Sequence, residues 1–215
     1  MKLIKASYEI ITPINGEEIL KQIELAVRSC YKSEDKIEYA DDGESDKAAN
    51  SNYAKSARLL IQKLIKLNHE AMLEFGGMIT VRFICDRGIS HELVRHRLCN
   101  FAQESSRYCN YSTIKNKDIQ LIHPRGLTDK QIKRREDHYW TVQALYEAEI
   151  SEGLSPQIAR GILPNSTKTE IVMTANLREW RHILKLRTAK GAHPQMIELM
   201  IPLQEELHKL LPLVF

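Results

Sequence analysis

Basic and hydroxyl side chains are concentrated in thirteen consecutive residues of this 215-residue chain, from Arg95 to Arg107. Arg95, His96 and Arg97 come first, and seven residues separate Arg97 from Ser105. Arginine guanidinium groups match the geometry of phosphate and carboxylate oxygens, and a serine hydroxyl beside them can donate one more hydrogen bond. So dense a positive cluster repels itself unless an anion compensates it. The segment therefore predicts a pocket for a phosphorylated small molecule.

A second polar set is expected on one face of a helix over residues 177–188. Asn176 can cap this helix, and Arg178 and His182 share a face because they are four residues apart. Arg187 lies near the far end, and an apolar stripe occupies the opposite side. A solvated basic face is the commoner interpretation of such a helix taken alone, and a ligand-facing helix is the alternative.

The elements expected to position these side chains are both strands and helices. Alternation and helical periodicity predict strands over 2–12, 78–85 and 169–175, and helices over 16–31, 53–67, 129–152 and 177–188. Ser90 is expected to cap a short helix through Arg97, ahead of a loop or irregular strand over 98–112. Further helices are expected to open at Ser155-Pro156, ending before Pro164, and at His193-Pro194.

The mixture of strands and helices favours the α+β class. We expect one domain over residues 1–215, with a central β-sheet packed by helices. Residues 33–52 are acidic and polar and carry few core-forming side chains, which predicts a surface loop or flap.

Composition and charge are ordinary for a globular protein, with 43% hydrophobic residues, 27% charged residues and a net charge of +3. No apolar run reaches the length of a membrane span, and the segment MKLIKASYEI lacks the apolar core of a signal peptide. Cys30, Cys85, Cys99 and Cys109 form no CxxC pair, so reduced thiols are expected. These features predict a cytoplasmic protein with no membrane partner.

Two other classes of protein could use the same side chains. A nucleic-acid-binding module could use the basic patch 95–97, but 31 basic residues are balanced here by 28 acidic ones, without a broad basic surface. A metal enzyme could use His91, His96, Cys99 and Cys109. The histidines are five residues apart and the cysteines ten, so no closed zinc pattern results. We expect neither a nucleic-acid partner nor a metal.

Several segments together resemble the flavin-dependent thymidylate synthases. The pattern RHR-x7-S runs from Arg95 to Ser105 and continues into Arg107-Tyr108. Similar context is provided by NHEAMLE (68–74), IARGILP (158–164), NSTKTEIVMTANLREWRHILKLR (165–187) and AHPQ (192–195). The resemblance extends from about residue 1 to residue 205 and so covers nearly the whole chain.

The resemblance implies an enzyme that makes dTMP from dUMP. The cofactor would be FAD, reduced by NADPH, and 5,10-methylenetetrahydrofolate would supply the carbon and leave as tetrahydrofolate. The family is a homotetramer whose sites are assembled from several subunits, so the chain is expected to have small-molecule substrates and copies of itself as partners.

The resemblance also implies the residues of two binding sites. FAD would contact Ala71, Glu74, Arg95, His96, Arg97, Gln103, Asn176, Leu177, Arg178, His182 and His193. The substrate dUMP would contact Glu92, Leu93, Val94, Arg95, Gln103, Glu104, Ser105, Ser106, Arg107, Arg160 and Arg187. Among these, Ser105 and Arg107 would hold the phosphate. Arg187 would be the catalytic residue, because a permanently cationic group beside the uracil can stabilise the ionised ring.

Overall fold

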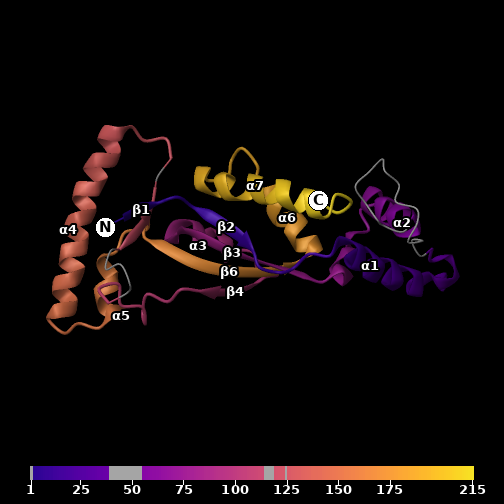
Figure 1. Cartoon of the computed structure of the whole chain (residues 1–215), viewed down its shortest axis with the longest axis horizontal. Coiled ribbons are helices and arrows are strands. Elements are labelled where there is room, and N and C mark those ends of the chain that lie inside the picture. Colours follow the sequence, from indigo (N-terminus) through magenta and orange to yellow (C-terminus); the bar gives the residue numbers. More distant parts are fainter. Residues whose placement is uncertain (1, 39–54, 114–118, 124) are drawn as a thin grey trace. The chain divides into compact units, whose positions relative to one another are not determined.

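The computed structural model of the chain describes residues 2–38, 55–113, 119–123 and 125–215 (Figure 1). The chain divides into two compact units that interleave along the sequence. The first unit comprises Met1–Glu9, Val81–Met173 and Gly191–Leu199, and the second comprises Ile10–Thr80, Thr174–Lys190 and Met200–Phe215.

A four-stranded sheet, most of whose residues belong to the first unit, has the order β2 (Ser7–Ile10), β3 (Met78–Asp86), β6 (Lys168–Asn176) and β4 (Asn100–Gln103). Every second side chain of β3 and β6 is buried, including Phe83 and Ile171, which are fully inaccessible. This period of two places one face of the sheet in the core. The strands predicted over 78–85 and 169–175 are therefore confirmed.

The segment that carries the predicted phosphate cluster begins with helix α3 (Arg87–Leu93), which follows β3 directly. Its N-cap is Asp86, whose Oδ1 accepts a 2.7 Å hydrogen bond from the Ile89 N–H. The prediction of Ser90 as the cap is wrong, because Ser90 lies inside the helix and its hydroxyl donates to the Arg87 carbonyl. The helix also ends at Leu93 rather than at Arg97, so Arg95–Arg97 lie in the turn beyond it.

The predicted strand over residues 2–12 is two strands with different partners. β1 (Lys2–Ile4) pairs in parallel with β5 (Gln120–Ile122), which the sequence reading missed, whereas β2 joins the four-stranded sheet. One continuous strand could not pair in both sheets, and Lys5 and Ala6, which separate β1 from β2, are not part of a strand.

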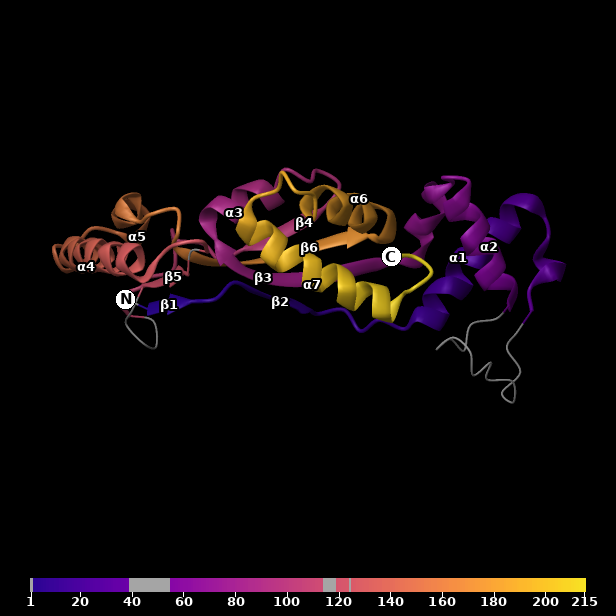
Figure 2. The same ribbon diagram turned by 90° about the horizontal axis from the view of Figure 1, so that it is seen from above.

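Three helical segments complete the first unit: α4 (Asp129–Ser151), α5 (Pro156–Ala159) and the 3₁₀ turn η3 (Arg160–Ile162). Thr128 and Gln131 form a reciprocal capping box at the start of α4. Figures 1 and 2 show α5 beside α4. A small core of Tyr111, Ile119, Tyr146 and Ala159 lies between these segments.

The second unit is mainly helical, with α1 (Gly16–Tyr31), the 3₁₀ turn η1 (Glu34–Lys36), α2 (Lys55–Lys66), the 3₁₀ turn η2 (Glu70–Gly76) and α6 (Leu177–Arg187). Helix α1 packs against α2 and η2 (Figure 2). Gly76 is required where η2 meets α6, because a Cβ there would come within 2.4 Å of Leu177 Cδ1. Helix α7 (Pro194–Leu210) begins in the first unit and continues in the second.

The α+β class is confirmed, and so are the predicted helices over 16–31, 129–152 and 177–188 to within a residue. The predicted helix 53–67 is confirmed over Lys55–Lys66. The expected flap over 33–52 contains η1, and from residue 39 onward it lies outside the described residues. None of the described helices is long and apolar enough to cross a membrane.

Candidate functional site

The chain makes a tight turn around Ser105 directly after β4. The N–H groups of Tyr108 and Cys109 both donate to the Ser105 carbonyl, at 3.1 and 2.9 Å, and the Arg107 N–H lies 3.4 Å from Ser105 Oγ. The Arg107 side chain is exposed, and its guanidinium lies 5.6 Å from the centroid of the Tyr108 ring. The turn therefore holds a hydroxyl and an accessible guanidinium on neighbouring residues, as the phosphate interpretation requires.

Arg160 is brought to this turn from a distant part of the sequence. Its Nη1 donates to Ser106 Oγ at 3.2 Å across a separation of 54 residues. Ser106 is only 4% exposed, so this contact is formed inside the unit. Ser106 and Arg160, which the family resemblance assigns to dUMP, are thus adjacent in space.

The side chains of three other residues assigned to dUMP are engaged in the fold. Leu93 is fully buried. The amide nitrogen of Gln103 donates to Ser90 Oγ at 2.9 Å and to Thr169 Oγ1 at 3.2 Å. The carboxylate of Glu104 is bound by Tyr111 and Lys168, neither of which the sequence reading singled out.

The turn after α3 alternates between exposed and buried side chains. Arg95 and Arg97 are exposed, whereas His96 between them is only 6% exposed. The backbone N–H groups of Arg95 and His96 donate to the carbonyls of Glu92 and Leu93 at 3.3 and 3.1 Å, which fixes the turn. Two guanidinium groups are therefore accessible to an anion, with Glu92 half-buried and Val94 exposed beside them.

Five of the eleven residues assigned to FAD lie on η2 and α6 of the second unit. Arg178 Nη1 lies 2.7 Å from Glu74 Oε1, and both side chains are about half exposed, at 51% and 44%. Such an exposed ion pair contributes at most about 1 kcal/mol, so Arg178 can exchange this partner for a ligand anion at small cost. Ala71 and His182 are exposed on the same two elements.

Helix α6 separates a polar face from a core face, as predicted. Asn176 caps it by accepting from the Glu179 N–H at 2.9 Å. Leu177 and Trp180 are fully buried, and the Trp180 indole donates to the Ile79 carbonyl at 2.9 Å. Arg187 is half-buried at the last residue of the helix.

His193 lies in the first unit, immediately before α7, where its Nδ1 accepts from the Gln195 N–H at 3.2 Å. Gln195 in turn binds Asp86, with its Oε1 accepting from the backbone N–H at 3.1 Å and its Nε2 donating to Oδ2 at 2.9 Å. The cap of α3 and the start of α7 are thereby joined, and His193 is exposed at that junction.

The protonation of Cys85 argues against a thiolate nucleophile at this position. Burial of the thiol, assisted by the negative charge of Asp86, raises the pKa of Cys85 to about 12. The thiol is therefore protonated at neutral pH and inert as a nucleophile.

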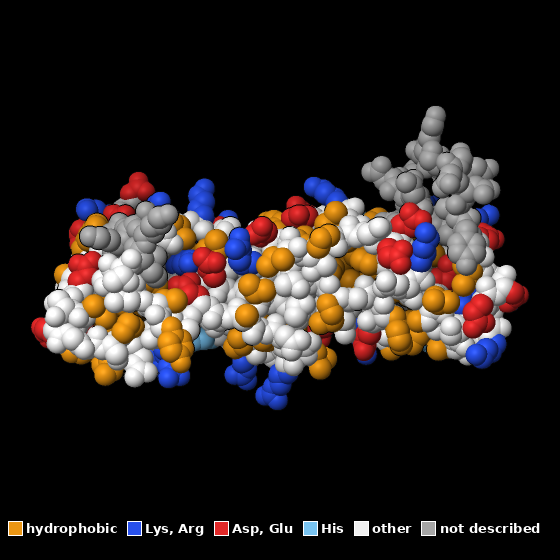
Figure 3. Space-filling view, turned by 60° about the horizontal axis from the view of Figure 1, so that its bottom comes forward, with side chains coloured by type: hydrophobic (Ala, Val, Ile, Leu, Met, Phe, Trp, Pro, Cys, Tyr) orange, Lys and Arg blue, Asp and Glu red, His pale blue; other side chains and the backbone are white. Residues whose placement is uncertain are grey.

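The particular ligand set that the sequence suggested for a metal enzyme does not form in the structure, and Figure 3 shows one face against which a broad basic surface can be checked. Within the described residues, His91, His96, Cys99 and Cys109 do not converge into a group of three metal ligands. The face shown in Figure 3 carries Lys and Arg side chains interspersed with Asp and Glu rather than a continuous basic surface. A zinc site needs ligands that converge on one point, and a nucleic-acid-binding surface is usually broadly basic.

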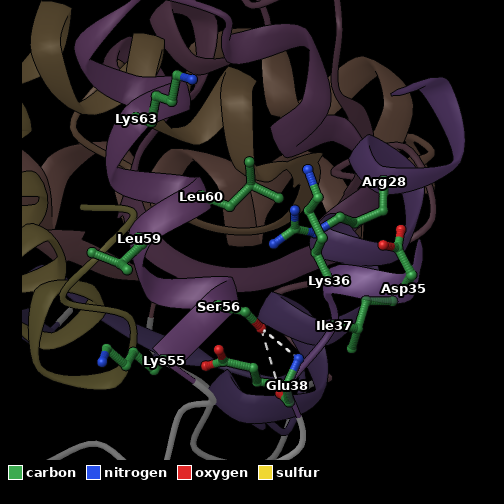
Figure 4. A pocket seen from close by; sticks show the side chains of 10 residues that line it. All are labelled: Arg28, Asp35, Lys36, Ile37, Glu38, Lys55, Ser56, Leu59, Leu60 and Lys63. Carbon is green, nitrogen blue, oxygen red and sulfur yellow. Dashed lines mark hydrogen bonds between the residues drawn. The ribbon is translucent and has the colours of Figure 1, made fainter. Parts of the chain in front are cut away.

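A cavity of about 520 Å³ lies in the second unit between η1 and the two helices beside it (Figure 4). Its basic lining residues are Arg28, Lys36, Lys55 and Lys63, and its acidic ones are Asp35 and Glu38. None of the residues assigned to FAD or dUMP lines this cavity.

Known proteins resemble the chain over nearly its whole length. Residues 14–213 match the family model described as thymidylate synthase complementing protein. Two proteins named flavin-dependent thymidylate synthase are similar. The alignment with the Corynebacterium efficiens protein is 30% identical over 220 residues and covers 95% of this chain and 80% of the relative. The alignment with the Mycobacterium tuberculosis protein is 28% identical over 210 residues and covers 90% and 77%.

Solved structures support the same fold. The UMP/dUMP methylase PolB from Streptomyces cacaoi, bound with 5-Br dUMP, superposes with a TM-score of 0.77 at 22% identity and covers 100% of this chain and 95% of that one. Its complex with 5-Br UMP gives a TM-score of 0.75 at 20% identity, covering 100% and 94%. The family match over residues 14–213, confirmed by the relative at 30% identity, shows that the chain belongs to the thymidylate synthase complementing protein family.

Proposed function

We propose that this protein is a flavin-dependent thymidylate synthase, which methylates dUMP at C5 of the uracil to give dTMP. The observation that carries the proposal, beside family membership, is the turn at Ser105–Arg107 with Arg160 bound to Ser106. A hydroxyl and two guanidinium groups in one place suit a phosphate monoester, which accepts several charge-assisted hydrogen bonds at once.

FAD is the cofactor that we propose, with NADPH and 5,10-methylenetetrahydrofolate as co-substrates. The residues present suit a flavin dinucleotide, because each unit offers exposed guanidinium groups that can neutralise a diphosphate, Arg95 and Arg97 in the first and Arg178 in the second. When bound, the flavin supplies the redox chemistry and the handling of the one-carbon unit. His182 and His193 are exposed, so their rings are accessible to a bound cofactor.

We assign activation of the uracil to Arg187. Making C5 nucleophilic places negative charge on the ring nitrogen N3 and the two carbonyl oxygens. A guanidinium remains cationic at neutral pH and can stabilise that charge without a covalent bond to the ring. In this assignment Ser105 is a phosphate ligand rather than a nucleophile.

Several further properties belong to the same proposal. We infer that the two units act as one domain, since the family match spans both of them. We also propose a homotetramer whose sites are shared between subunits, small molecules rather than nucleic acid as ligands, and a cytoplasmic location.

The decisive test is a reaction that measures two products at once. Purified protein should show a flavin absorbance spectrum and should oxidise NADPH only when dUMP and methylenetetrahydrofolate are present, with dTMP formed in a one-to-one ratio. Reactions without dUMP serve as controls. A colourless protein that cannot be loaded with FAD, or NADPH oxidation without dTMP, would contradict the proposal.

A further inference from the structure

Glu104, one of the residues assigned to dUMP, has its polar groups committed to other parts of the fold. Its Oε1 accepts from the Tyr111 hydroxyl at 2.9 Å, and its Oε2 accepts from Lys168 Nζ at 2.9 Å and from the Glu170 N–H at 3.2 Å. Its own N–H donates to the Glu170 carbonyl at 2.9 Å. The side chain is 15% exposed, so these bonds are largely sheltered from water.

The partners of Glu104 are themselves anchored. Tyr111 is 8% exposed, its N–H donates to the Tyr146 hydroxyl at 3.3 Å, and the two rings lie 6.1 Å apart. Lys168 and Glu170 lie on β6, and Lys168 Nζ also binds Glu170 Oε1 at 2.7 Å. Glu104 therefore connects the end of β4 to β6 on one side and to helix α4 on the other.

Lys168 and Tyr111 both keep their protons around neutral pH. Burial lowers the pKa of Lys168, but its hydrogen bonds to Glu170 and Glu104 and their negative charges outweigh that effect, so the pKa is raised. Burial and then the charge of Glu104 raise the pKa of Tyr111, so its hydroxyl remains a donor. An unpaired carboxylate at position 104 would repel a phosphate held by the next residues, and Lys168 removes that repulsion.

We propose that Glu104, Tyr111 and Lys168 are positioning residues for dUMP: they hold the Ser105–Arg107 turn in its phosphate-binding geometry, and the Glu104 side chain does not contact the substrate. The inference rests on the proposed function. Ser105 follows Glu104 directly, and the turn closes on the Ser105 carbonyl, so fixing Glu104 against β6 fixes where the turn begins. Tyr111 and Lys168 are thereby assigned a role in substrate binding without touching the substrate.

The test measures dUMP binding directly, by calorimetry on the FAD-loaded protein, for Glu104→Gln, Tyr111→Phe and Lys168→Met. Each variant is expected to raise the Kd of dUMP about tenfold, the effect of one lost hydrogen bond to a charged group. FAD affinity and kcat at saturating dUMP should stay near wild type. Because Glu104 and Tyr111 act through one network, the double variant Glu104→Gln/Tyr111→Phe should be hardly worse than either single variant.

Matched controls break exposed ion pairs within helices α1 and α4 that include no residue of the Glu104 network. Glu17→Gln breaks the Glu17–Lys21 pair and Lys133→Met the Lys133–Asp137 pair, and both should leave the Kd of dUMP unchanged. Thermal unfolding confirms that each variant is folded, and Tyr111→Phe removes only one hydroxyl.

Two results would overturn the inference. Weaker dUMP binding in Glu104→Gln with normal binding in Tyr111→Phe and Lys168→Met would mean that Glu104 contacts the substrate. Unchanged binding in all three variants would mean that the network does not position the turn. Failure of the proposed function is distinguishable, since the wild-type protein would then bind no dUMP at all.

Discussion

At the scale of single residues, the charge on Arg187 is the feature that we propose takes the place of a covalent nucleophile. Cys85 is fully buried and its pKa is raised to about 12, so it cannot supply a thiolate at neutral pH. Arg187 ends helix α6, where the carbonyl end of the helix favours a cation. A guanidinium in that place can stabilise developing negative charge on a substrate while the helix holds its backbone.

Arg187→Ala is expected to lower turnover by about 100-fold or more, the usual cost of removing a group that stabilises an anionic transition state. The flavin spectrum should be retained, because FAD is assigned to other residues of α6. Product formation by chromatography and flavin absorbance together measure both effects. Lys185→Ala, which removes an exposed cation from the same helix, is the matched control and should be near wild type. Near-normal turnover in Arg187→Ala would refute the assignment.

At the scale of elements, two strand-to-helix junctions position several of the side chains that we assign to the ligands. β3 leads directly into α3 and β6 directly into α6, and in each case the last strand residue, Asp86 or Asn176, accepts a hydrogen bond from the N–H three residues later. The cap fixes the rotation of each helix as it leaves the sheet. The exposed face of α6, with Arg178 and His182, follows from that rotation.

Removing the cap of α6 should therefore affect both stability and cofactor binding. Asn176→Ala is expected to lower the free energy of unfolding of the FAD-free protein by about 1 kcal/mol, whereas Asn176→Asp retains the cap and should cost little. Thr128→Ala removes the cap of α4 and should cost a similar amount while leaving FAD affinity unchanged. Denaturant titration and FAD binding measure the two effects. If Asn176→Ala were less stable but bound FAD as tightly as wild type, Asn176 would have only a capping role.

Elements with strong local signals could be predicted from the sequence, and those that depend on distant partners could not. The helix after Thr128 and the helix after Asn176 carry their own caps and periodicity. β5 has three residues and exists because β1 pairs with it, which no local pattern reveals. The N-cap of α3 was predicted at Ser90 instead of Asp86, because both residue types suit a cap and only the position where β3 ends decides between them. The Glu104 network joins residues up to 66 apart, so sequence spacing gave no sign of it.

At the scale of the whole molecule, the residues assigned to one substrate are widely separated in the chain. Arg107 belongs to the first unit and Arg187 to the second. In a homotetramer with shared sites, the two arginines that serve one dUMP can come from different copies of the chain. Ring and dihedral assemblies allow this, because every interface and every site is repeated by symmetry.

Mixing two inactive variants tests that arrangement directly. Arg107→Ala and Arg187→Ala should each be nearly inactive alone. After subunit exchange in an equal mixture, about a quarter of the sites would combine an intact Arg107 from one chain with an intact Arg187 from another, if assembly is random. Turnover should therefore recover toward a quarter of the wild-type value, and light scattering should give a mass four times that of the 24.8 kDa chain. A mixture of wild type with Arg187→Ala controls for exchange. No recovery in an exchanged tetramer would place both arginines of a site in one chain, and a monomeric mass would exclude shared sites.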